Sequence, residues 1–106
     1  MIGLAMMLAA ADPDPYVACL KDRVAEFEVS GESASDVARA VIYACISLEI
    51  KPSPDNMLGK MSFDDQQSAM TRLRAAFENH LILRIVRMRA CRKTPGCKIG
   101  SLPDKL

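Results

Sequence analysis

The sequence predicts an all-α fold, a small helical domain made of an antiparallel helix hairpin and a long C-terminal helix that is either straight or bent. The composition favours helices over strands. Of the 106 residues, 50% are hydrophobic but only 5% are aromatic, so Ala, Leu, Ile, Val and Met supply most of the apolar surface. Apolar residues also recur at helical spacing in three stretches separated by Gly and Pro. The length suits one domain, which we place at residues 12–106.

The first two stretches predict the hairpin. Asp14 and Pro15 are typical of an N-cap and a first helical turn, and the helix that they begin is expected to end at Ser30-Gly31. Ser35 is the expected N-cap of the second helix, which should end at Lys51-Pro52. The apolar stripe of this second helix consists of Val37, Val41, Ala44 and Leu48.

The third stretch predicts one long helix over Phe63–Arg92, opened by Ser62 and ended by Thr94-Pro95-Gly96. Its apolar stripe consists of Met70, Leu73, Phe77, Leu81, Met88 and Cys91. Such a helix is about 45 Å long, whereas a hairpin helix of roughly sixteen residues reaches only about 24 Å. The hairpin therefore leaves part of the long helix uncovered, and we expect this to be the half that follows His80.

The four cysteines predict two disulfides. Cys19 and Cys45 each lie thirteen residues from Glu32 at the centre of the hairpin loop, so an antiparallel pair of helices places them at the same height. Cys91 and Cys97 flank a short loop at the end of the long helix and form the second expected pair. Free buried thiols in a cytosolic protein are the alternative interpretation. A zinc site is disfavoured because no C-x-x-C pair is present.

The first eleven residues predict either a signal peptide or an N-terminal helix. The stretch is apolar and closes in Ala9-Ala10-Ala11, which is the small-residue pattern that precedes signal cleavage. No Lys or Arg precedes it, which speaks against export. With the cysteines, this pattern predicts a periplasmic or secreted protein, with a cytoplasmic one as the alternative. The apolar stretch of residues 1–11 is too short to cross a membrane, and no other apolar run is long enough for a transmembrane segment.

Charge divides unevenly along the chain and indicates a candidate interface. Residues 1–65 carry five Lys or Arg against eleven Asp or Glu, while residues 66–106 carry nine against two. Around residues 82–89 the long helix is apolar on more than one face and also rich in arginine. The candidate interface residues are Ile82, Leu83, Arg84, Ile85, Val86, Arg87 and Arg89. A homodimer, a protein partner, or a fourth helix folded back from a bend near Asn79 would each cover this surface.

No residue pattern predicts catalysis, a cofactor or a metal site. Gly59-Lys60 matches only the end of a phosphate-binding loop, because Pro54 and Met61 stand where glycine and a hydroxyl residue are needed. His80 is the only histidine and has no catalytic neighbours in the sequence. The paired acids Asp64-Asp65 are explained as charges that favour a helix N-terminus.

These observations predict a small non-enzymatic helical protein that is exported and binds a partner through its apolar and basic C-terminal helix. The alternative is a nucleic-acid-binding protein that uses the arginines of that helix, although these point around the helix and lack interleaved aromatics. A membrane-surface protein is a third interpretation, weakened because apolar and charged residues are poorly segregated there.

Overall fold

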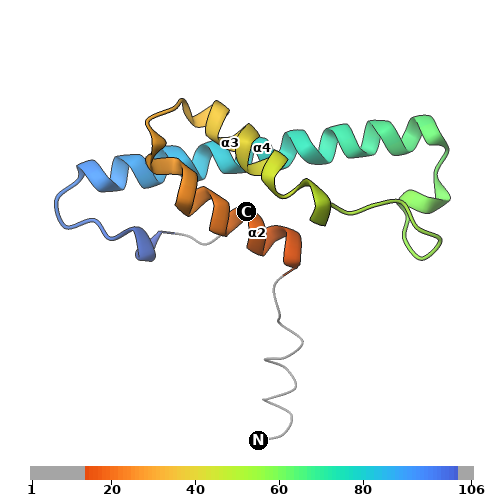
Figure 1. Ribbon diagram of the computed structural model, residues 1–106, viewed down its shortest axis with the longest axis horizontal. Coiled ribbons are helices and arrows are strands. Elements are labelled where there is room, and N and C mark those ends of the chain that lie inside the picture. Colours follow the sequence, from red (N-terminus) through yellow and green to blue (C-terminus); the bar gives the residue numbers. More distant parts are fainter. Residues whose placement is uncertain (1–13, 103–106) are drawn as a thin grey trace, which may run out of the picture.

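The computed structural model describes residues 14–102, and this part of the chain contains helices and no strand (Figure 1). Within residues 14–102, three α-helices, labelled α2, α3 and α4, are joined by loops and short 3-10 helices. The all-α fold predicted from composition and periodicity is confirmed for these residues. The stretch 1–11, predicted as a signal peptide or an N-terminal helix, lies outside the described residues.

Helix α2 spans Pro15–Phe27 and begins as the sequence predicts. The Asp14 side chain accepts a hydrogen bond from the backbone N–H of Tyr16 at 2.7 Å, and Pro15 occupies the first turn. The 3-10 helix η1 continues the chain over Glu28–Ser30. Gly31 then ends the segment with φ +84°, a left-handed conformation that favours glycine.

Helix α3 spans Ala34–Ala44, so it begins and ends earlier than expected. Ser33, not Ser35, is the N-cap, because its hydroxyl accepts a hydrogen bond from the Asp36 N–H at 3.1 Å. After α3 the chain tightens into the 3-10 helix η2, Ile46–Leu48. The predicted apolar stripe of this helix is therefore wrong at its C-terminal end, because Ala44 and Leu48 are exposed. Cys45 is fully buried instead, where it is cross-linked to Cys19 of α2.

The loop between η2 and α4 is held together by Asn56. Its amide donates to the Lys51 carbonyl at 2.8 Å, and its side-chain oxygen accepts from the backbone N–H groups of Ser53 and Gly59. A Cβ at Gly59 would lie 1.7 Å from the Ser53 carbonyl oxygen, so only glycine fits this approach. The 3-10 helix η3, Leu58–Lys60, completes the loop. Gly59 is therefore explained by loop packing.

Helix α4 spans Phe63–Lys93 without a break and so is about 46 Å long. The Ser62 hydroxyl caps it by accepting from the Asp65 N–H. No bend occurs near Asn79, because the helix continues through that position. The chain reverses only after Thr94, and the 3-10 helix η4, Ile99–Ser101, returns to pack beside α4.

The core is formed where α3 packs against both α2 and α4. Its buried members are Tyr16, Leu20, Val24, Val37, Ala38, Val41, Cys45, Leu81, Ile85 and Met88. The helix hairpin covers α4 from its middle to its C-terminal end. The first turns of α4 extend beyond the hairpin and lie beside the loop that precedes α4 (Figure 1). The expectation that the half after His80 is uncovered is wrong. Leu81, Ile85 and Met88 share one face of α4, and burying that face removes more apolar surface from water than the polar first turns would.

Candidate functional site

The two predicted disulfides are present. Cys19 and Cys45 are cross-linked with their Cα atoms 5.9 Å apart, which joins α2 to the end of α3 as the equal distances from the hairpin loop predict. Cys91 and Cys97 are cross-linked with Cα atoms 5.3 Å apart and close the loop after α4. No free cysteine remains. Two disulfides in so short a chain are typical of proteins that fold in an oxidising, extracellular compartment.

The predicted interface on α4 is divided by the fold. Ile85 is fully buried in the core and Ile82 is half-buried against it, so these two do not form an exposed patch. The expectation is wrong for Ile85, because the hairpin packs directly on its face of the helix. Leu83 and Val86 are about half exposed, and Arg87 is exposed beside them. An interface at these three residues stays a prediction.

The basic residues at the end of α4 are partly tied to the hairpin by Glu28. Arg89 donates two hydrogen bonds, from Nε and Nη2, to the Glu28 carbonyl at 3.2 and 3.0 Å. The Glu28 carboxylate is buried and forms an ion pair with Arg92. Arg84 is partly buried. Intramolecular contacts therefore engage Arg89 of the predicted interface, and also Arg92, which follows it on the helix.

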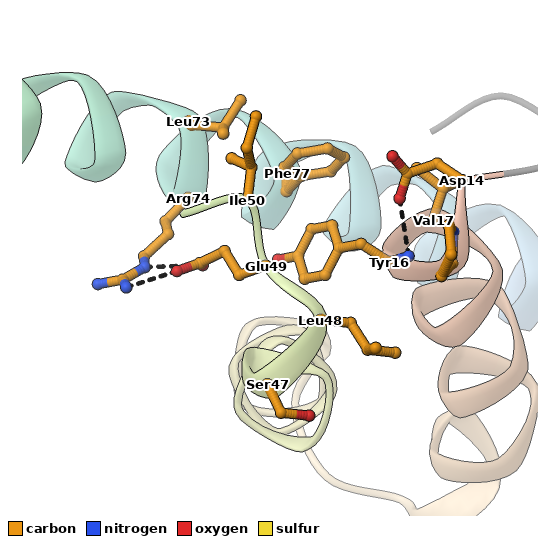
Figure 2. Close-up of a pocket in the computed structure, with 11 residues that line it drawn as sticks. Asp14, Tyr16, Val17, Ser47, Leu48, Glu49, Ile50, Leu73, Arg74 and Phe77 are labelled. Atoms are coloured by element: carbon orange, nitrogen blue, oxygen red, sulfur yellow. Dashed lines mark hydrogen bonds and ion pairs between the residues drawn. The ribbon is translucent and has the colours of Figure 1, made fainter. Parts of the chain in front are cut away.

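A large hollow lies elsewhere, between the N-terminus of α2, the segment around η2 and the middle of α4 (Figure 2). We call it the Tyr16 pocket, and its volume is about 540 Å³. It is lined by Asp14, Pro15, Tyr16, Val17, Ser47, Leu48, Glu49, Ile50, Leu73, Arg74 and Phe77. Hollows of this size with apolar walls and a few polar groups are typical of ligand sites.

Glu49 and Arg74 form the polar wall of the Tyr16 pocket. Nε and Nη2 of Arg74 donate to the two carboxylate oxygens of Glu49 at 2.8 and 2.6 Å, a bidentate pair (Figure 2). The Glu49 side chain is only 6% exposed, whereas that of Arg74 is 48% exposed. The hydrogen bond to Glu49 raises the pKa of Arg74, so this guanidinium stays charged. The pair fixes the segment after η2 against α4.

Tyr16 and Phe77 form the aromatic floor. Their ring centroids are 5.2 Å apart at an interplanar angle of 85°, an edge-to-face contact between α2 and α4. The Tyr16 hydroxyl is buried and has no hydrogen-bond partner among the described residues. Burial first, and then the negative charge of Glu49, raise the pKa of this phenol, while Arg74 lowers it. The phenol is therefore neutral at physiological pH.

Sequence reasoning missed the Tyr16 pocket because its residues come from three separate segments. Leu73 and Phe77 were assigned to the core stripe of α4, yet Leu73 is exposed and Phe77 is half-buried at the pocket. One signal was available in the sequence. Glu49 is a lone acid between Leu48 and Ile50, and such an acid is buried only when a partner neutralises it.

The remaining candidates form no second site within residues 14–102. His80 is exposed on α4, and Asp64 and Asp65 lie in the first turn of that helix. In this range no group of three or more His, Cys, Asp or Glu is placed to hold a metal ion. No helix among the described residues is long and apolar enough to cross a membrane. In comparisons with known proteins, no family model, curated sequence or solved structure matches this chain.

Proposed function

We propose that this chain is an exported, non-enzymatic binding protein that holds an apolar part of its ligand in the Tyr16 pocket. One observation carries the proposal. Leu48, Ile50 and Leu73 are 48%, 48% and 37% exposed, and all three line the same hollow. Apolar side chains gathered around a preformed concavity are costly to leave in water and mark a binding surface.

The contacts that surround the pocket make it rigid. The Cys19–Cys45 disulfide fixes the hairpin on one side, and the Glu49–Arg74 pair fixes the segment after η2 to α4. A ligand therefore meets a site that needs little ordering, which lowers the entropic cost of binding. This favours binding as the role of the pocket.

Export is supported by the disulfides and by the small-residue pattern at Ala9-Ala10-Ala11. A non-enzymatic role is supported by the chemistry of the pocket wall. Glu49 is held in a bidentate pair with Arg74, Asp14 caps α2, and burial raises the pKa of the Tyr16 phenol, so each of these groups already has a structural role.

Nucleic-acid binding is the alternative function, and the exposed side chains of Arg87, Lys93 and Lys98 favour it. Arg89 and Arg92 weaken this alternative because Glu28 engages both of them. Salt-dependent retention of the protein on duplex DNA, lost when Arg87 and Lys93 are changed to Gln, would support it over binding in the Tyr16 pocket.

Titration with N-phenylnaphthylamine, an uncharged apolar dye, tests the pocket. We expect saturable binding to the oxidised protein and an affinity about thirtyfold lower for the double variant L48Q/L73Q, because each of the two leucines contributes on the order of 1 kcal/mol. The matched control is L83Q/V86Q, which changes two exposed apolar residues on α4 outside the pocket. Unchanged affinity in L48Q/L73Q, or an equal loss in L83Q/V86Q, would contradict the proposal.

A further inference from the structure

A second hollow adjoins the Tyr16 pocket along α2. This hollow has a volume of about 350 Å³ and shares Pro15 and Leu48 with the pocket. Its other lining residues are Ala18, Cys19, Asp22 and Arg23. Pro15, Ala18, Cys19 and Asp22 recur at helical spacing, so they form one face of α2. We call the two adjoining hollows, with the Pro15 and Leu48 side chains that line both, the α2 trough.

Two carboxylates beside the α2 trough form no ion pair with any described residue, although that of Asp14 also caps α2. Asp14 lies at one end and Asp22 near the other, and both are exposed. The two cations that line the trough are already paired within the chain. Arg74 is engaged by Glu49, and Arg23 forms an ion pair with Glu26 at 2.6 Å. An apolar trough with carboxylates at its ends complements an apolar ligand that carries positive charge.

The length of the α2 trough indicates the form of that ligand. Asp14 and Asp22 are eight residues apart on α2, which corresponds to about 12 Å along the helix axis. Two turns of a second helix span about 11 Å and present apolar side chains at positions i, i+3, i+4 and i+7. A bilayer is too flat to fill a concave trough, and both anionic lipid and nucleic acid would be repelled by its carboxylates.

We infer that the partner is a protein segment that forms a basic amphipathic helix and lays its apolar stripe in the α2 trough, with Lys or Arg beside Asp14 and Asp22. This inference rests on the proposed function, because it names the ligand class of the same site. The apolar stripe covers Leu48 and Leu73, and the flanking cations pair with the two carboxylates.

Labelled peptides of about 16 residues test the inference by fluorescence anisotropy. One has Leu at i, i+3, i+4 and i+7 and Lys elsewhere, and its control carries Glu in place of every Lys. We expect the Lys peptide to bind the full-length oxidised protein about tenfold more tightly at low salt, and this preference to shrink as ionic strength rises.

Matched protein variants separate trough binding from general attraction. D14N/D22N removes the two trough carboxylates, and Asn at position 14 preserves the helix cap. E32Q/D36N removes two acids near the hairpin loop, away from the trough, and so changes the net charge equally. We expect D14N/D22N to lose most of the preference for the Lys peptide and E32Q/D36N to keep it. E32Q/D36N, whose two positions line neither hollow, should bind N-phenylnaphthylamine as the wild type does.

The outcomes distinguish this inference from the proposed function. Equal binding of the two peptides, or equal effects of the two double variants, overturns the basic-helix inference. If the dye still binds in that case, the proposed role of the Tyr16 pocket is unaffected. Loss of dye binding itself overturns both. Concentration-dependent dimers that dissociate in L48Q/L73Q, or anionic vesicles that bind wild type but not that variant, would assign the trough to a second copy or to a membrane and overturn the inference.

Discussion

The buried carboxylate of Glu49 accepts two hydrogen bonds from the half-exposed guanidinium of Arg74, which lies 25 residues further along the chain. This pair connects the segment after η2 to the middle of α4 and forms one wall of the Tyr16 pocket. Neither residue belongs to the apolar core, and their contact closes one side of the pocket beside it.

Replacing Arg74 with Met should lower the free energy of unfolding by about 1–3 kcal/mol, because Glu49 would stay buried without its partner. Urea denaturation measures the change. The control is Arg72→Met, since Arg72 is an exposed residue on the same helix. Equal free energies of unfolding for the two variants would show that the Glu49–Arg74 pair does not stabilise the segment after η2 against α4.

Alkaline pH should destabilise the protein through Tyr16. Burial and the charge of Glu49 raise the pKa of the folded-state phenol above its usual value of 10.0. The unfolded chain therefore loses this proton first. The stabilisation is complete below pH 10 and is lost as the pH rises through the folded-state pKa.

Tyr16→Phe should thus lose less stability between neutral and strongly alkaline pH than Tyr43→Phe, which removes an exposed phenol. Thermal melts across this range measure the difference, and near-ultraviolet absorbance reports phenolate formation. The same alkaline loss in both variants would contradict the burial of Tyr16.

The two disulfides should differ in their contribution to stability. By the chain-entropy model, the Cys19–Cys45 cross-link contributes about 3.5 kcal/mol and the Cys91–Cys97 cross-link about 2.4 kcal/mol, because the first closes a longer loop. Guanidinium unfolding of the C19A/C45A and C91A/C97A double variants compares them. A larger loss in C91A/C97A would mean that the loop after α4, rather than the hairpin, is the more important cross-linked element.

Residues on opposite faces of α4 should respond differently to truncation. Ile85→Ala removes buried methyl groups from the core and should cost about 2–5 kcal/mol, whereas Leu83→Ala should cost less than about 1 kcal/mol. Urea unfolding measures both. A large loss for Leu83→Ala that depends on protein concentration would instead place Leu83 in an interface between two copies.

The sequence predicted the local structure and the disulfides well, because each depends on nearby signals. Asp14, Ser62 and Gly31 cap or end their helices as expected, and the Cys19–Cys45 pair follows from symmetry about the hairpin loop. Ser33 was missed as a cap because Ser35, two residues on, carries the same side chain.

The sequence predicted less well which part of α4 packs against the helix hairpin. Periodicity defines the faces of α4 but does not show which part of its length the hairpin covers, so Ile85 was assigned to an interface although it lies in the core. The Tyr16 pocket was not predicted because it depends on where α3 ends. Cys45 leaves the helix at that point, and the chain after η2 then turns Glu49 towards Arg74.

Export in a processed, fully oxidised form is tested most directly by the intact mass of protein isolated from its native compartment after free thiols are trapped with iodoacetamide. We predict a chain that begins at or near Asp12, carries no trapped thiol and yields a Cys19 to Cys45 peptide on non-reducing digestion. A chain that keeps Met1–Ala11 and carries alkyl groups on its cysteines would contradict export, and with it the role of the pocket in an extracellular binding protein.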